Sequence, residues 1–102
     1  MPDWETTTGV AKTLSGYARG SVLSLPLTGW HTPKIVMRSR ATGTTAQLDC
    51  QFDVNTGRFD YTLPGDQAAG GYDIQFSALD GAGDLHLFPE TTSKHLHVYP
   101  AL

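Results

Sequence analysis

The stretch Asp66-Gln67-Ala68-Ala69-Gly70-Gly71-Tyr72-Asp73-Ile74-Gln75-Phe76 decides the fold, because it joins a turn to the clearest strand pattern in the chain. The small residues at 68–71 are typical of a chain reversal. From Tyr72 onward apolar and polar side chains alternate, which is the period-two pattern of a half-buried strand. We therefore expect a strand over residues 72–78 whose buried face carries Tyr72, Ile74, Phe76 and Ala78.

An acidic residue, a corner of small residues and then a tyrosine resemble the tyrosine corner of Greek-key sandwiches. In that motif the tyrosine hydroxyl donates a hydrogen bond to the backbone of the corner. We expect Tyr72 to lie at the centre of the core, with its phenol bonded back to the corner that begins at Asp66.

Other segments of the chain also carry short strand patterns, and none carries a helical one. Turn residues such as Gly, Pro and Asn separate them. About seven short strands, some eight to twelve residues apart, predict an all-β fold, a single Ig-like antiparallel β-sandwich. We expect the strands at residues 21–25, 34–40, 47–54, 58–63, 72–78, 85–87 and 95–99, so that residues 21–102 form the sandwich.

Two hairpins should set the register of the sheet. Centring the first on residues 41–45 places Arg38 opposite Asp49 and Lys34 opposite Asp53, and such pairs contribute about 0.2–1 kcal/mol each. The second turns at Asn55-Thr56-Gly57, with Gly57 in the left-handed region as a bulge. The expected core comprises Ile35, Met37, Leu48, Cys50, Phe52, Phe59, Tyr61, Tyr72, Ile74, Phe76, Leu87, Leu96 and Val98.

Residues 1–20 are polar and irregular, and we expect an extended N-terminal arm. The segment has too few apolar side chains to offset about 1–2 kcal/mol of backbone entropy per residue on its own. An arm that becomes ordered on a neighbouring protein, a frayed terminus and a first strand paired with its own sheet all remain open. The candidate partner-binding residues are Trp4, Val10, Leu14 and Tyr17, together with Trp30 in the following corner.

Composition narrows the class of protein. The chain has 102 residues, of which 39% are hydrophobic and 17% charged, with 11 glycines and one cysteine. This length supports one domain with one core, and the glycines are typical of a turn-rich β protein. A single Cys50 excludes an internal disulfide and a multi-cysteine metal site. The sequence contains neither a long apolar run nor a secretory signal pattern, so we expect synthesis in a cytosol and no transmembrane segment.

The net charge of -3 argues against a nucleic-acid partner. Residues 1–47 carry five basic and two acidic side chains, giving 5 - 2 = +3, whereas residues 48–102 carry two and eight, giving 2 - 8 = -6. The first hairpin favours neutralisation across strand pairs within one sheet. Opposed patches that meet between copies or on a partner are the alternative.

No catalytic signature is present, and we do not expect an enzyme. Cys50 falls on the inward face of an expected strand, where a thiol is normally inert. There is no Gly-x-Ser-x-Gly elbow. Strand acids such as Asp49 and Asp73 are expected on the solvent face, where they serve solubility.

Two patterns bear on metal binding, and neither is complete. His95 and His97 project from one strand face, with His86 on the preceding strand, but a shared metal needs a third ligand across the sheet. Asp53, Asn55 and Asp60 imitate part of a calcium loop that lacks its bidentate glutamate. A hairpin turn explains Asn55 and Gly57, so we expect no required metal and no cofactor, with a cation at Asp53, Asn55 and Asp60 left open.

Several segments recur in order in a known family, and together they span residues 20–99: Leu27-Thr28-Gly29, Ile35-Val36-Met37-Arg38, Gly57-Arg58-Phe59-Asp60-Tyr61, Gly71-Tyr72-Asp73, Phe88-Pro89 and Leu96-His97-Val98. In these segments the sequence resembles the immunoglobulin-like N-terminal domain of tailed-phage baseplate upper proteins and related small phage tail proteins. The family's domain usually leads into a helical or fibre segment, whereas this chain stops at Leu102, so we expect a stand-alone accessory domain.

The resemblance implies a structural adaptor of a virion, in the tail, baseplate or head-tail region. Its partners would be other phage structural proteins and further copies of itself, with no nucleic acid and no membrane. A stand-alone Ig-like module that binds a carbohydrate or another surface ligand is the alternative. Trp4 or Trp30 would then serve as the stacking platform.

Overall fold

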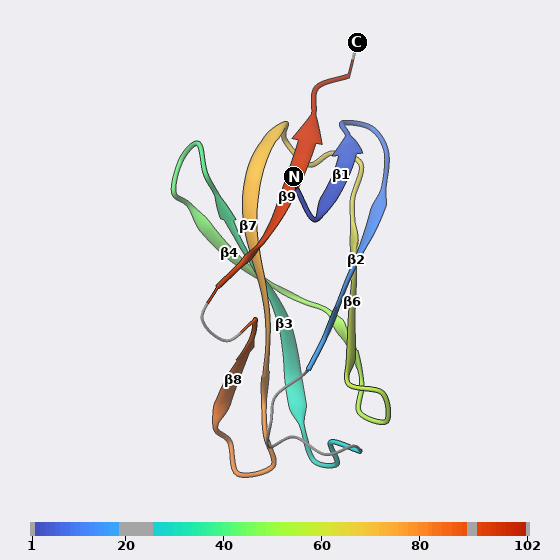
Figure 1. Cartoon of the computed structure of the whole chain (residues 1–102), viewed down its shortest axis with the longest axis vertical. Helices are drawn as coiled ribbons and strands as arrows, with labels where there is room; N and C mark the ends of the chain where they lie inside the picture. The colour runs from blue at the N-terminus through green and yellow to red at the C-terminus, as the bar shows by residue number, and fades with distance from the viewer. Residues whose placement is uncertain (1, 19–25, 90–91, 102) are drawn as a thin grey trace.

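The computed structural model describes residues 2–18, 26–89 and 92–101. They form nine β-strands and no helix (Figure 1). The strands are β1 (Trp4–Thr7), β2 (Lys12–Tyr17), β3 (His31–Ser39), β4 (Thr45–Asp49), β5 (Gln51–Asp53), β6 (Arg58–Leu63), β7 (Gly70–Leu79), β8 (Leu85–Phe88) and β9 (Lys94–Tyr99). The expected strand at residues 21–25 lies outside the described residues.

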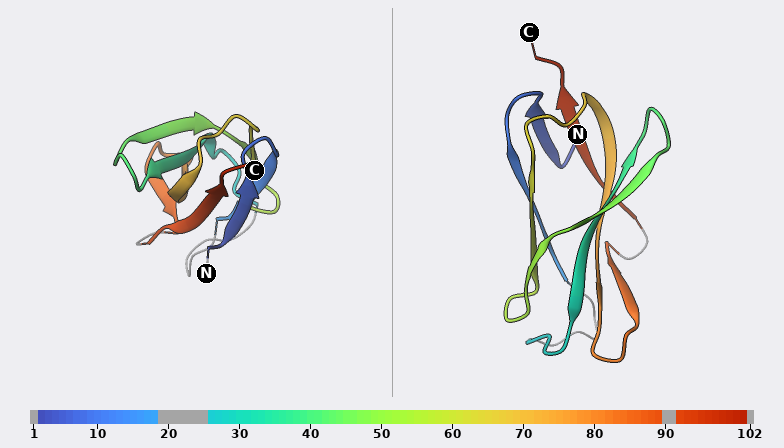
Figure 2. Two further views of the ribbon diagram at one scale, coloured as in Figure 1. Left: turned by 90° about the horizontal axis from the view of Figure 1, so that it is seen from above. Right: turned by 180° about the vertical axis from the view of Figure 1, so that it is seen from behind.

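The strands form two sheets that face each other as a sandwich (Figure 2). Sheet A has the order β1-β9-β7-β3-β4, with β8 also paired to β7, and sheet B has the order β2-β6-β5. The pairs are antiparallel except β1 and β9, which run parallel. Two packed sheets and a tyrosine corner before β7 are features of the immunoglobulin-like sandwich. The all-β sandwich expected from the sequence is therefore confirmed.

Strand β7 is the centre of the fold, as the alternating pattern predicted. It lies between β3 and β9, and Tyr72, Ile74, Phe76 and Ala78 are all buried. The Tyr72 hydroxyl donates a hydrogen bond to the Ala68 carbonyl oxygen at 2.7 Å. The tyrosine corner is confirmed by this bond, which ties the turn to the strand that follows it.

The core fills the space between the sheets. Its largest fully buried side chains are Phe59, Leu14, Ile35, Leu63, Ile74, Leu96 and Val98. Phe59 of sheet B stacks on Phe76 of sheet A with ring centroids 5.3 Å apart, so the two sheets meet through aromatic packing.

Five expected core residues are not fully buried. Leu48 is 37% exposed, while Cys50, Phe52, Tyr61 and Leu87 are only half-buried. For Leu87 the expectation had the wrong strand face, because Phe88 pairs with Phe76 and faces the core with it. Leu14 is the core residue most clearly missed.

The prediction of an extended N-terminal arm is wrong. Residues 4–7 pair with β9 in sheet A, residues 12–17 pair with β6 in sheet B, and the side chain of Leu14 is 0% exposed. The backbone hydrogen bonds of both strands help to offset the loss of backbone entropy, which the few apolar side chains could not offset on their own. The alternative of a first strand paired with its own sheet describes this region correctly.

The expected strand 47–54 is two strands in different sheets. The chain leaves sheet A after Asp49 and enters sheet B at Gln51, with the Cys50 amide donating to the Pro33 carbonyl oxygen. Asp49, the last residue of β4, pairs with Lys34, and Arg38 pairs with Thr45. The predicted register was therefore wrong by four residues, an even shift that leaves each side chain on its expected face.

The second hairpin and the charge pairing agree better with expectation. Strand β6 has its predicted bounds, and Gly57 has φ +72° after the turn that joins Asp53 to Arg58. Cations of the first half pair with acids of the second in sheet A, as Lys34–Asp49, Arg38–Asp73 and Arg40–Asp73. These pairs support neutralisation within one sheet.

Candidate functional site

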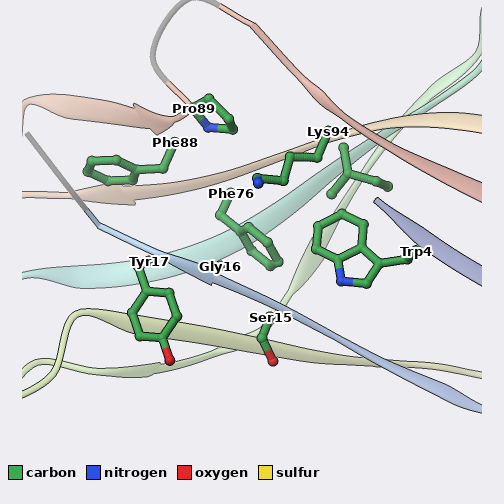
Figure 3. A pocket seen from close by; sticks show the side chains of 9 residues that line it. Trp4, Ser15, Gly16, Tyr17, Phe76, Phe88, Pro89 and Lys94 are labelled. Carbon is green, nitrogen blue, oxygen red and sulfur yellow. The ribbon is translucent and has the colours of Figure 1, made fainter. Parts of the chain in front are cut away.

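The most prominent hollow lies between the sheets on the side where β1 and β2 are edge strands, which we call the open side. It is a cleft of about 590 Å³, within the size range of ligand pockets (Figure 3). Its lining comes from β1, β2, β7, β9 and the end of β8, and consists of Trp4, Ser15, Gly16, Tyr17, Ile74, Phe76, Phe88, Pro89 and Lys94. We refer to this set of residues as the cleft.

The cleft brings together two of the five predicted partner-binding residues. Trp4 enters it from β1 and Tyr17 from β2, although 13 positions separate them in the chain. Leu14 instead belongs to the core, and Val10 is 56% exposed in the turn between the two strands. The other cleft residues had no local signal, because they become neighbours only when β7, β8 and β9 meet β2.

Trp30, the fifth candidate, is half-buried and packs against the core. Its ring lies 4.6 Å from that of His86 and 6.1 Å from that of Phe88, measured between centroids. His86 Nε2 in turn donates to Asp80 Oδ2 at 2.9 Å, and this hydrogen bond is the main cause that holds the pKa of Asp80 below its usual value. Trp30 therefore packs against the core at one end of the sandwich and is not part of the cleft.

Gly16 shapes the floor of the cleft. A Cβ atom at this position would lie 2.7 Å from Cδ2 of Phe76, closer than real Cβ contacts come. Glycine thus allows the backbone of β2 to cross directly over the Phe76 ring. The ring therefore fills the space that a side chain at residue 16 would take, and it forms the floor of the cleft while remaining only 3% exposed.

Lys94 supplies the cation of the cleft. It occupies the same strand face as the buried Leu96 and Val98, so it projects inward at the start of β9, and Figure 3 shows it with Phe76 and Trp4. Within the part of the chain that the structure describes, Lys94 forms no ion pair and no side-chain hydrogen bond. A positive charge therefore stands beside an apolar floor.

The polar rim on β2 is satisfied internally. Ser15 Oγ donates to Asp60 Oδ1 at 2.6 Å, and Arg58 Nε forms an ion pair with the same oxygen at 2.9 Å. Asp53 Oδ1 accepts from the Asn55 amide at 2.9 Å. The acids of the suggested calcium loop are thus engaged by the protein's own donors.

The outer face of sheet A is a second polar region. Desolvation raises the pKa of Asp73, but hydrogen bonds from Arg40 and Arg38 outweigh it and hold this pKa below its usual value. His95 packs near Arg40, and its Nε2 atom is buried with no hydrogen-bond partner among the described residues. Desolvation, then the charges of Arg40 and His97, lower the pKa of His95.

Metal and nucleophile chemistry find little support in the described residues. Among residues 2–18, 26–89 and 92–101, no three His, Cys, Asp or Glu side chains gather as a metal site. His86 lies with Trp30 and Asp80, whereas the rings of His95 and His97 are 6.1 Å apart. Burial, then the charges of Asp49 and Asp60, raise the pKa of Cys50 to about 11, which disfavours the reactive thiolate.

A scan against protein-family models finds no match, and a search of curated proteins finds no similar sequence. None of the described segments forms a helix of the length and hydrophobicity needed to span a membrane.

Proposed function

We propose that this chain is a non-enzymatic structural adaptor of a tailed-phage virion, which docks on a neighbouring virion protein through the cleft. The virion context rests on the resemblance of residues 20–99 to phage baseplate upper proteins. The observation that carries a docking role is the cleft itself, where aromatic side chains meet a cation that has no ion-pair partner among the described residues.

The chemistry of the cleft suits docking. Aromatic residues are enriched where proteins bind one another, because they bury a large apolar area with little loss of side-chain freedom. Trp4, which is half-buried, offers such area beside the buried Phe76, and Lys94 offers a charge that a complementary partner can pair. These are the features of an anchor site for a protein segment.

The test is the protein content of purified phage particles. We expect mass spectrometry to find this chain at a fixed copy number relative to a major tail protein. Trp4→Ala should lower its incorporation, whereas Val10→Ala, at an exposed position outside the cleft, should not. Absence from particles, or presence only in traces, would contradict the virion role.

A carbohydrate-binding module is the second candidate, and the position of Trp4 in the cleft favours it. An indole beside an open cavity can stack on a sugar ring. Screening the isolated protein against a glycan array tests this role. Saturable binding of one glycan that Trp4→Ala abolishes would support it over the adaptor.

A further inference from the structure

Strand β2 lies beside the cleft with one of its edges facing it. It is the terminal strand of sheet B in the described part of the chain. The Ala18 amide donates to the carbonyl of Gly57, which lies directly opposite in the β2–β6 register. Hydrogen-bonded pairs alternate along an antiparallel ladder, so Gly16 and Leu14 also bond to β6.

The same alternation directs the N–H and C=O groups of Ser15 and Thr13 away from β6. Across the described segments no strand pairs with this edge, and no backbone bond from Ser15 or Thr13 on that side is present. Ser15 lines the cleft, so its free donor and acceptor open into it. This geometry is what an additional strand requires.

The neighbouring strand leaves room for that addition. Strand β1 belongs to sheet A and begins at Trp4, and Figure 1 shows β2 continuing along the sandwich past that beginning. An added strand would lie about 4.8 Å from β2, on the side of the cleft. Its inward side chain would then enter the cleft, which Phe76 lines.

The charge of Lys94 determines which kind of segment can bind at the edge of β2. Lys94 points into this space without an ion-pair partner among the described residues. An inward-pointing charge at an edge disfavours pairing with arbitrary apolar strands. A segment that carries a carboxylate at the matching position would neutralise it, so the edge is selective rather than generally adhesive.

We propose that the edge of β2 accepts an extended segment of a partner protein as an added β-strand, which places an apolar side chain on Phe76 and an acidic side chain against Lys94. The inference rests on the proposed adaptor function and specifies its docking mode. A protein strand fits better than a saccharide, because the exposed groups are backbone donors and acceptors at the spacing of a β-ladder.

The first experiment selects ligands from a library of random twelve-residue peptides displayed on the surface of cells, with the full-length protein as bait. We expect enriched peptides with alternating apolar residues and one Asp or Glu at a constant position. Failure to enrich any peptide, or enrichment without an acid, would overturn the proposal. Tighter binding of glucuronic-acid oligosaccharides than of any peptide would also overturn it and identify a carbohydrate site.

Two pairs of variants test the two contacts separately. Ser15→Pro removes the edge N–H and should abolish binding of the selected peptide, whereas Ser15→Ala keeps that N–H and should bind. Lys94→Met should weaken binding roughly tenfold to a hundredfold, while Lys94→Arg should not. Lys94→Glu should recover affinity for a peptide whose acid is replaced by Lys. Equal affinities within either pair would contradict the corresponding contact.

Amide hydrogen exchange gives a readout that does not depend on any variant folding. The Ser15 amide should exchange fast in the free protein and slowly with the selected peptide bound. The Gly16 amide, which bonds to β6, is the matched control and should be protected in both states. A peptide that binds without protecting Ser15 would show that it does not add as a strand.

These results separate the proposal from the virion role on which it rests. A protein that binds acidic peptides at β2 but is absent from particles retains the docking mode and loses the virion role. A protein that is incorporated equally well with Ser15→Pro and Lys94→Met retains the virion role and docks by another surface.

Discussion

On one side of the sandwich the chain passes from sheet A to sheet B at Cys50, whereas on the open side β1 and β2 are edges of different sheets. Where β4 continues into β5, covalent continuity joins the two sheets. On the open side the connection is the turn between β1 and β2, where the Gly9 amide donates to the Gly65 carbonyl. Beyond that turn the sheets separate around the cleft.

The difference shows how one sandwich can be stable and still offer a pairing edge. The open side is secured from within by Leu14, which is completely buried, and by Phe59 stacking on Phe76. Its exposed backbone groups are therefore not needed for folding and remain available to a partner. Each of the following changes tests this division between anchoring and available groups.

The largest effect should come from deleting residues 1–18. The deletion removes β1, β2 and the buried Leu14, and so takes away one edge of each sheet. We expect loss of cooperative unfolding, measured by circular dichroism during heating. The extended arm expected from the sequence would have left melting unchanged. A truncated protein that still melts in one sharp transition would therefore restore that view.

Phe76→Ala should destabilise the protein by about 3–5 kcal/mol. Phe76 is the floor of the cleft and also packs on Phe59, so its removal opens a cavity between the sheets. Leu48→Ala, in β4 at the other edge of sheet A and 37% exposed, should change stability by less than about 1 kcal/mol. Urea denaturation of both variants provides the measurement. Equal losses would mean that the two edges are anchored alike.

Gly16→Ala should destabilise by about 1–3 kcal/mol, because the new methyl group would force Phe76 to move. Gly81→Ala is the matched control, since no atom would lie within 4 Å of its Cβ. We expect urea midpoints to fall for the first variant and to stay nearly constant for the second. A neutral Gly16→Ala would indicate that the floor of the cleft adapts readily.

The smallest effect concerns pH and His95, on β9 next to the open side. Because the folded state lowers the pKa of His95, the unfolded chain binds its proton more readily. The contribution of His95 is complete above its unfolded pKa of about 6.5 and is lost as pH falls through the lower folded value. Denaturation at pH 7 and pH 5 should show a smaller stability difference for His95→Gln than for the original protein. An unchanged difference would assign the pH dependence to other groups.

Local pattern and turn chemistry determined a large part of the fold in advance. The alternation in residues 72–78, the corner that binds the Tyr72 hydroxyl and the Gly57 turn were all recognisable, because each depends on residues close together in sequence. The faces of β3 and β9 followed in the same way from the alternation of Ile35 with Met37 and of Leu96 with Val98. These features define an all-β sandwich with little help from distant contacts.

Only the tertiary structure decided which strands pair and which side chains come into contact. Residues 47–54 alternate as one strand, yet pairing with both sheets divides them at Cys50 and moves the β3–β4 register by four residues. Residues 1–20 are too polar to predict as core, yet residues 4–7 and 12–17 pair at two sheet edges and Leu14 is buried. Trp4 and Lys94 come together with Phe76 because β1, β9 and β7 are neighbours in sheet A, a matter of pairing between distant segments. Local sequence encodes the direction in which a side chain points, whereas the partner across a sheet depends on the free energy of long-range pairing.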